Sequence, residues 1–103
     1  MEPLDKLLRT AIADRRLVSF SLDGLPRVGE PHDYGVSDGV PTLFFYQTGG
    51  KSRSGKPLGW RNAVVGKITG LRVLEERFPG TRPAPTGQHK KWDQLYASVS
   101  TRG

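Results

Sequence analysis

Two short stretches of the sequence hold residue types that could carry chemistry. The first, Gly50 to Lys56, reads GKSRSGK and fits the spacing GxxxxGK of a phosphate-binding loop. That motif continues with Ser or Thr, which holds magnesium, and with a helix whose N-terminus faces the phosphates. Here Pro57 comes next, and the following LGWRNAVV has no helical periodicity. We therefore do not expect nucleotide hydrolysis.

The second stretch is EPHD, in which Glu30 and His32 lie two residues apart. On a strand they would point to one face, where they could form a proton-transfer pair or part of a metal site. A metal site needs a third ligand, and the only other histidine, His89, lies far along the chain. No nucleophile accompanies the pair. Local hydrogen bonding is the simpler interpretation, and we expect neither an enzyme nor a cofactor.

Basic residues are concentrated in one part of the chain. Residues 1–50 carry five Lys or Arg and seven Asp or Glu, whereas residues 51–91 carry ten and two. The whole chain has a formal charge of +6. Such polarisation favours an anionic partner, although a basic surface that only aids solubility has the same composition.

Length and composition set the outer limits. The 103 residues suffice for one domain, and the absence of cysteine excludes disulfides and thiolate metal sites. No stretch reaches the roughly 20 apolar residues of a membrane span, and the N-terminus MEPLDKLLRT is unlike a signal peptide. We expect a cytoplasmic protein without a membrane partner.

The residue pattern predicts a mainly β fold. Leu4, Leu7, Leu8, Ala11 and Ile12 recur at helical spacing and predict a helix over residues 3–14. Short apolar runs then predict five strands, near residues 18–22, 26–35, 42–47, 60–68 and 71–76. Turn residues separate the first strands at Asp23-Gly24 and Ser37-Asp38-Gly39, and Pro31 predicts an edge or bulge. Five short strands close most economically into a small SH3/Sm-like barrel, because closure removes exposed edges.

The C-terminal part is expected to be organised differently. We expect the barrel to occupy residues 1–78, a Pro/Gly linker 79–87, and a short helix with a frayed tail 88–103. Trp92, Leu95, Tyr96 and Val99 recur at helical spacing and form one apolar stripe. A helix this short is marginal alone, so it would dock on the barrel or on a partner.

Several blocks together resemble a known family. LDKLLRTAIADRRLVSFSLDG is followed by PRVGEPHDYGV, TLFFYQTGG and GWRNAVVGKITGLRVL. Over roughly residues 4–78 the chain resembles the WYL domain, a small Sm-like (SH3-type) barrel common in bacterial transcription regulators, and in particular its short stand-alone forms. Leu43-Phe44-Phe45 takes the place of the tripeptide Trp-Tyr-Leu. The resemblance implies a regulatory module that senses a nucleic acid or nucleotide through a basic patch. Its basic positions match Arg27, Arg61 and Lys67.

Other residues could complete such a surface. His32 and Gln47 lie in the predicted strands and could hydrogen-bond a ligand, although Gln47 could equally cap a strand edge. Basic and aromatic side chains together suit single-stranded nucleic acid, because phosphates pair with the former and bases stack on the latter. The sequence offers Lys51, Arg53 and Lys56 in a loop, with Tyr46 and Trp60 beside it. The same aromatic residues could instead pack in the core.

Two functions are consistent with these residues. The first is a ligand-sensing or nucleic-acid-binding module that holds an anion on a basic barrel face. The alternative is a protein-interaction adaptor whose C-terminal aromatic helix recruits a partner.

Overall fold

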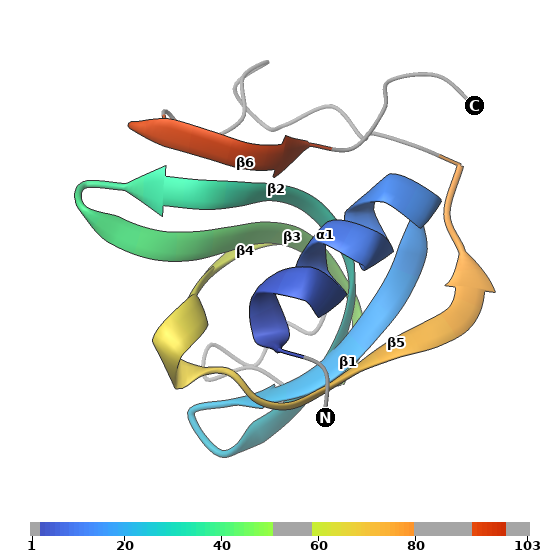
Figure 1. Ribbon diagram of the computed structural model, residues 1–103. Coiled ribbons are helices and arrows are strands. Elements are labelled where there is room, and N and C mark those ends of the chain that lie inside the picture. Colours follow the sequence, from blue (N-terminus) through green and yellow to red (C-terminus); the bar gives the residue numbers. More distant parts are fainter. Residues whose placement is uncertain (1–2, 51–58, 80–91, 99–103) are drawn as a thin grey trace.

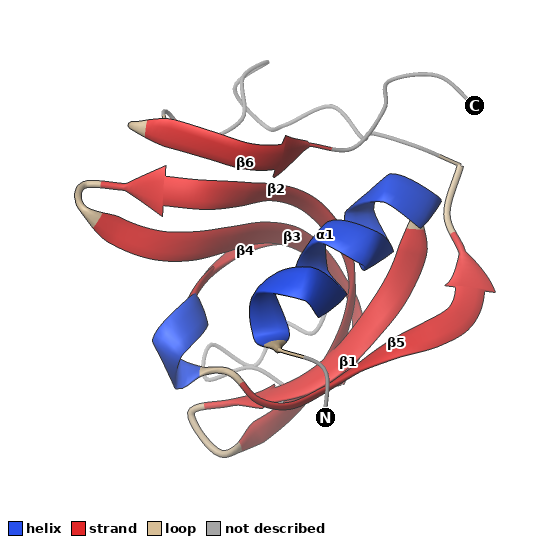
Figure 2. Cartoon of the chain, viewed as in Figure 1, coloured by secondary structure: helices blue, strands red, loops and turns tan. Residues whose placement is uncertain are grey.

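The computed structural model describes residues 3–50, 59–79 and 92–98. Their elements are a helix α1 (Leu4–Asp14), the strands β1 (Arg16–Leu22), β2 (Leu25–Ser37), β3 (Val40–Gly50) and β4 (Gly59–Val64), a 3-10 turn η1 (Val65–Lys67), and the strands β5 (Thr69–Arg77) and β6 (Gln94–Ser98). Figure 1 shows α1 packed across a strongly bent sheet. The fold is therefore mainly β with one N-terminal helix, as the sequence predicts, and Figure 2 shows how much of it is strand.

Two tight hairpins set the register of the sheet. Asp23 and Gly24 both have positive φ, at 55° and 74°, and Asp38 and Gly39 repeat this at 52° and 75°. Two consecutive residues of this kind make the turn whose twist matches that of the flanking strands. The turns pair Leu22 with Leu25 and Ser37 with Val40.

The strands form an antiparallel sheet in the order β4-β3-β2-β1-β5. Because β4 and β5 end this order, the sheet is open in the part of the chain that the structure describes, and the predicted closed barrel is not established. β2 is bent and long enough to pair with β1 near its start and with β6 near its end (Figure 1). The predicted bulge occurs in β2, where the register shifts between Pro31 and Asp33.

The core lies between α1 and the inner face of the sheet. Leu8, Ala11 and Ile12 of α1 are buried, as are Val18, Phe20, Leu43 and Phe45 of the strands. The rings of Phe20 and Phe45 meet edge to face at 5.1 Å between centroids. The inner face is the face of the sheet that carries Phe20 and Phe45, and the outer face is the opposite one.

The prediction of a C-terminal helix is wrong for the residues that the structure describes in this segment. Residues 94–98 form β6, which pairs with β2 from Asp33 to Val36. The reason is tertiary: β2 extends beyond β1, and an open strand edge offers backbone hydrogen bonds that outweigh the weak preference of a short helix. Within the predicted linker only Pro79 is described, and residues 99–103 also lie outside the described residues.

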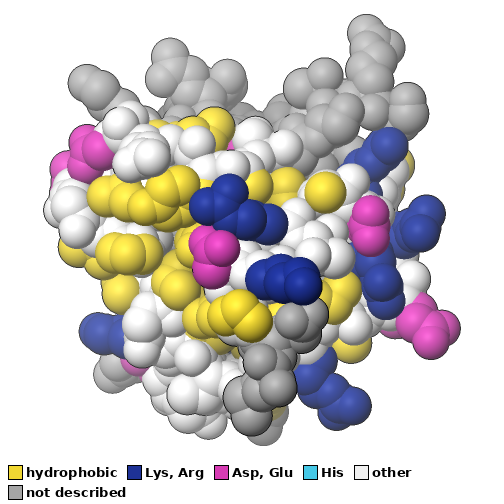
Figure 3. Space-filling view, in the orientation of Figure 1, with side chains coloured by type: hydrophobic (Ala, Val, Ile, Leu, Met, Phe, Trp, Pro, Cys, Tyr) yellow, Lys and Arg dark blue, Asp and Glu magenta, His cyan; other side chains and the backbone are white. Residues whose placement is uncertain are grey.

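On one face of the molecule, basic and apolar side chains are unevenly distributed (Figure 3). Figure 3 shows Lys and Arg on the side of β5 and apolar side chains on the side of the β2–β3 turn. Val40 and Leu95, 40% and 47% exposed, are among the exposed apolar residues. In the described part of the chain, no helix has the length and apolar character that a membrane crossing requires.

Candidate anion-binding site

Arg27 carries its charge on the inner face of the sheet. It pairs with Phe20 across the β1–β2 hairpin, and directly paired residues of antiparallel strands point to the same face. The side chain is only 4% exposed. An arginine buried among core aromatics is unusual, because Arg is mostly exposed unless it is paired.

Gln47 of β3 is the neighbour that holds Arg27. It is fully buried, and its Oε1 accepts a hydrogen bond from Arg27 Nη1 at 3.4 Å. Its Nε2 donates to the carbonyl oxygen of Gly49 at 3.0 Å, which fixes the amide with its oxygen toward the arginine. Gly29 pairs with Gln47, and a Cβ there would lie 2.6 Å from the Phe45 ring. This end of the sheet is therefore closely packed around the amide.

Arg61 of β4 brings a second guanidinium to the same region. It pairs with Phe45, so its side chain also leaves from the inner face. Its Nη1 donates to the carbonyl oxygen of Trp60 at 3.1 Å and lies 3.6 Å from the position that a Cβ on Gly59 would take. Because Gly59 pairs with Gln47, the guanidinium of Arg61 turns back toward the strand neighbour of that amide.

These three residues, the Arg27–Gln47–Arg61 cluster, hold positive charge that is only weakly compensated at Arg27. Arg27 Nε is buried and has no hydrogen-bond partner, and no described carboxylate lies within ion-pair distance of Arg27. Burial lowers the pKa of Arg27, the exposed Asp23 opposes that shift, and the charge of Arg61 adds to it. An anion placed beside Nε would supply the acceptor that this donor lacks.

His32 lies elsewhere. It is the extra residue of the β2 bulge, is fully buried, and donates from Nδ1 to the carbonyl oxygen of Glu30 at 2.8 Å. Its ring stacks on Phe78 at 5.4 Å between centroids and meets Trp60 edge-on at 4.7 Å. The structure therefore places His32 in an aromatic cluster and does not bring it to Arg27.

Tyr46 and Trp60 pair across β3 and β4 and lie in that aromatic cluster on the outer face. Trp60 stacks on Phe44 with centroids 4.6 Å apart and rings 7° from parallel, and Tyr46 meets it edge-on at 5.4 Å. Both predicted stacking residues are partly buried. Their packing matches the alternative in which they serve the fold, and they lie on the face opposite to Arg27.

Of the remaining predicted cations, the structure describes only Lys67, which does not join the cluster. Lys67 is exposed in η1, and it is not among the charges that act on the pKa of Arg27. Lys51, Arg53 and Lys56 lie outside the described residues. Of the basic stretch 51–91, the structure also describes Arg72 and Arg77, which are exposed on β5.

The apolar stripe predicted as a partner-binding helix is divided in the structure. Tyr96 of β6 packs edge-on against Tyr34 of β2 at 5.2 Å, whereas Leu95 is exposed. Trp92 is partly buried, and its Nε1 is buried without a hydrogen-bond partner. Val99 lies outside the described residues. The helix on which the adaptor hypothesis depended is therefore absent from the described C-terminal segment.

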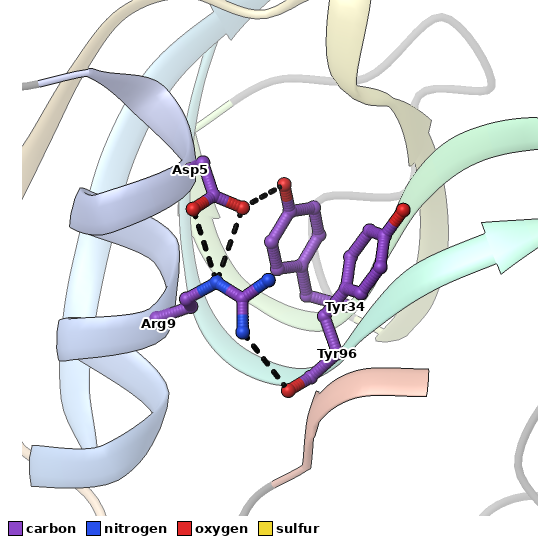
Figure 4. A network of polar contacts seen from close by, with 4 residues as sticks. All are labelled: Asp5, Arg9, Tyr34 and Tyr96. Carbon is purple, nitrogen blue, oxygen red and sulfur yellow. Dashed lines mark hydrogen bonds and ion pairs between the residues drawn. The ribbon is translucent and has the colours of Figure 1, made fainter. Parts of the chain in front are cut away.

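A polar network that sequence reasoning missed joins α1, β2 and β6. Asp5 accepts hydrogen bonds from Arg9 Nε at 3.1 and 3.0 Å and from the Tyr34 hydroxyl at 2.7 Å (Figure 4). Arg9 also lies 5.0 Å from the Tyr96 ring centroid and donates from Nη1 to the Tyr96 carbonyl oxygen at 3.4 Å. The spacing of Asp5 and Arg9, four apart on a helix, was the available signal. No pattern in the sequence indicated that Tyr34 of β2 and Tyr96 of β6 would join this network.

This network predicts a shifted titration. Burial, with the hydrogen bond to Asp5, raises the pKa of Tyr34 from 10.0 to about 12. The folded state therefore favours the neutral phenol, and this contribution to stability is present below pH 10 and lost as the pH rises through about 12. An alkaline titration of phenolate absorbance should show the late titration of Tyr34, and in the Asp5→Asn variant this tyrosine should titrate earlier. A late tyrosine that is insensitive to Asp5→Asn would contradict the network.

In the described residues, no three His, Cys, Asp or Glu side chains are grouped so that they could hold a metal ion. Comparisons with protein-family models, curated proteins and solved structures gave no significant match. The geometry of the Arg27–Gln47–Arg61 cluster is therefore the basis on which a function can be assigned to this chain.

Proposed function

We propose that this protein is a small anion-binding module, not an enzyme, and that the Arg27–Gln47–Arg61 cluster holds its ligand. The observation that carries the proposal is the buried Nε of Arg27, which has no partner. A buried charged donor without a partner is unfavourable, so the site is incomplete until an acceptor occupies it. Arginine is also the residue best suited to planar, bidentate contacts with phosphate or carboxylate oxygens.

The class of ligand comes from the resemblance to the WYL domain, which implies a nucleic acid or nucleotide and a regulatory role. Two observed features are consistent with the SH3/Sm-like barrel that this resemblance implies. The helix α1 leads directly into β1. The strands follow the order β4-β3-β2-β1-β5, and a 3-10 turn links β4 to β5, the strands at the two ends of that order. Single-stranded nucleic acid is accordingly the first ligand to test.

The test is a chemical-shift titration of the full chain with a short single-stranded oligonucleotide at low salt. We expect the largest shifts at Arg27, Gln47 and Arg61. We also expect the affinity to fall steeply with salt, because phosphate contacts release counterions. The Arg61→Ala variant should bind at least about tenfold more weakly, since it loses charge-assisted hydrogen bonds.

The matched control is Arg72→Ala, which removes an exposed arginine of β5. It should bind like the native chain apart from a small change in salt dependence. Shifts that centre on β5 instead of the cluster, or equal losses in the two variants, would contradict the proposed site. An absence of binding to the oligonucleotide, to inorganic phosphate and to sulfate would contradict the proposed function altogether.

A further inference from the structure

The cluster restricts how a ligand can reach it. Arg27 is 4% exposed and Gln47 is fully buried, and both lie on the inner face beside Phe20 and Phe45. A phosphate inside a nucleic-acid strand carries a nucleoside on either side, and both would have to enter this apolar region. A phosphate at the end of a chain enters with one substituent that points outward.

The number of free phosphate oxygens also distinguishes a terminal phosphate from an internal one. Arg27 uses Nη1 for Gln47, which leaves its buried Nε without an acceptor. The edge of a guanidinium that contains Nε binds two oxygens of one oxyanion side by side. A terminal phosphate offers three unesterified oxygens, so two can meet Arg27 while the third remains for a second donor, and Arg61 approaches from β4. An internal phosphodiester offers only two.

The charge of the ligand also favours a terminal phosphate. A terminal phosphate carries about −1.5 to −2 at pH 7, whereas an internal phosphodiester carries a single negative charge. Arg27 on β2 and Arg61 on β4, the strands on either side of β3, both carry positive charge, so they attract the more highly charged terminal phosphate more strongly. Asp23, the nearby carboxylate that favours the charged form of Arg27, is exposed and outside ion-pair distance.

From these observations we infer that the Arg27–Gln47–Arg61 cluster recognises a terminal phosphate, a phosphomonoester, at the end of its ligand. The inference rests on the proposed function and narrows it: the module reads the phosphorylated end of a nucleic acid or a mononucleotide, not the internal backbone of a strand. Gln47 acts as a positioning residue, because it orients Arg27 through Nη1 and leaves the Nε edge for the phosphate.

The experiment compares oligonucleotides of one sequence with a 5′-phosphate, a 3′-phosphate or hydroxyls at both ends, in anisotropy competition against a labelled 5′-phosphorylated strand. We expect a phosphorylated end to bind about tenfold more tightly than the hydroxyl form, as charge-assisted contacts to an added group predict. Nucleoside monophosphates and inorganic phosphate form further arms and separate a nucleotide requirement from recognition of phosphate alone. Competition by a nucleoside monophosphate should strengthen between about pH 5 and 7, around the second pKa of a phosphomonoester of about 6, while competition by sulfate stays flat.

The variants decide where the preference originates. Arg27→Met should abolish the preference for the phosphorylated end, and Arg72→Met, on exposed β5, should retain it. Equal affinity for phosphorylated and hydroxyl strands would overturn the inference while leaving the proposed anion-binding function in place. A preference that survives Arg27→Met would also overturn it. No binding in any arm would remove both.

Discussion

An Arg27→Met variant is expected to bind anions at least about tenfold more weakly than the native chain and to be more stable by about 1 to 2 kcal/mol. The gain in stability comes from the site itself. Burial lowers the pKa of Arg27, which means that the folded state disfavours its charge, and its Nε has no partner. Methionine fills a similar apolar space without a charge or a donor.

Denaturant unfolding of the two chains, with and without phosphate, measures both effects. Phosphate should raise the midpoint of the native chain and leave that of Arg27→Met unchanged, because a ligand stabilises only the state that binds it. Arg72→Met is the matched control, and we expect its stability to change by less than about 0.5 kcal/mol. If Arg27→Met were instead strongly destabilised, Arg27 would be a structural residue and the binding site would lose its anchor.

The sequence indicates which residues belong to the candidate site better than it indicates which of them lie close together. Arg27, Gln47 and Arg61 were all expected as ligand-binding residues, and the structure brings them together. His32 was expected with them, yet it lies five residues after Arg27, and an odd separation on a strand places side chains on opposite faces. That parity was visible in the sequence. The approach of Gln47 to Arg27 was not, because it depends on a register shift between Val28 and Gly29 that only the folded pairing reveals.

The fold shows the same division between local and tertiary causes. The helix and both Asp-Gly turns arise from local chemistry, and they appear where expected. Trp92 to Val99 has a helical period, but Gln94 to Ser98 becomes a strand because β2 offers an edge that no local pattern announces. Likewise, Val65 to Lys67 forms a 3-10 turn where a continuous strand was expected, so the chain can pass from β4 to β5.

The close approach of β6 to β2 makes Gly35 the most sensitive position of that junction. Gly35 pairs with Leu95, and a Cβ at Gly35 would fall on the carbonyl oxygen of Gln94 and lie 2.9 Å from the Leu95 Cα. These are backbone atoms, so no side-chain rotation relieves the overlap. Gly35→Ala should therefore displace β6 and lower stability by about 1 to 3 kcal/mol, the usual range for overpacking.

Amide hydrogen exchange locates that displacement. In Gly35→Ala, exchange should accelerate in β6 and at the β2 residues that pair with it, Asp33 to Val36, while the β1–β2 hairpin keeps its protection, since α1 and the core hold it independently. Gly66→Ala is the control, because a Cβ there meets nothing within 4 Å. We expect its exchange to match that of the native chain. Unchanged protection of β6 in Gly35→Ala would mean that β6 does not pack against Gly35 in solution, and the strand would then have to be placed elsewhere.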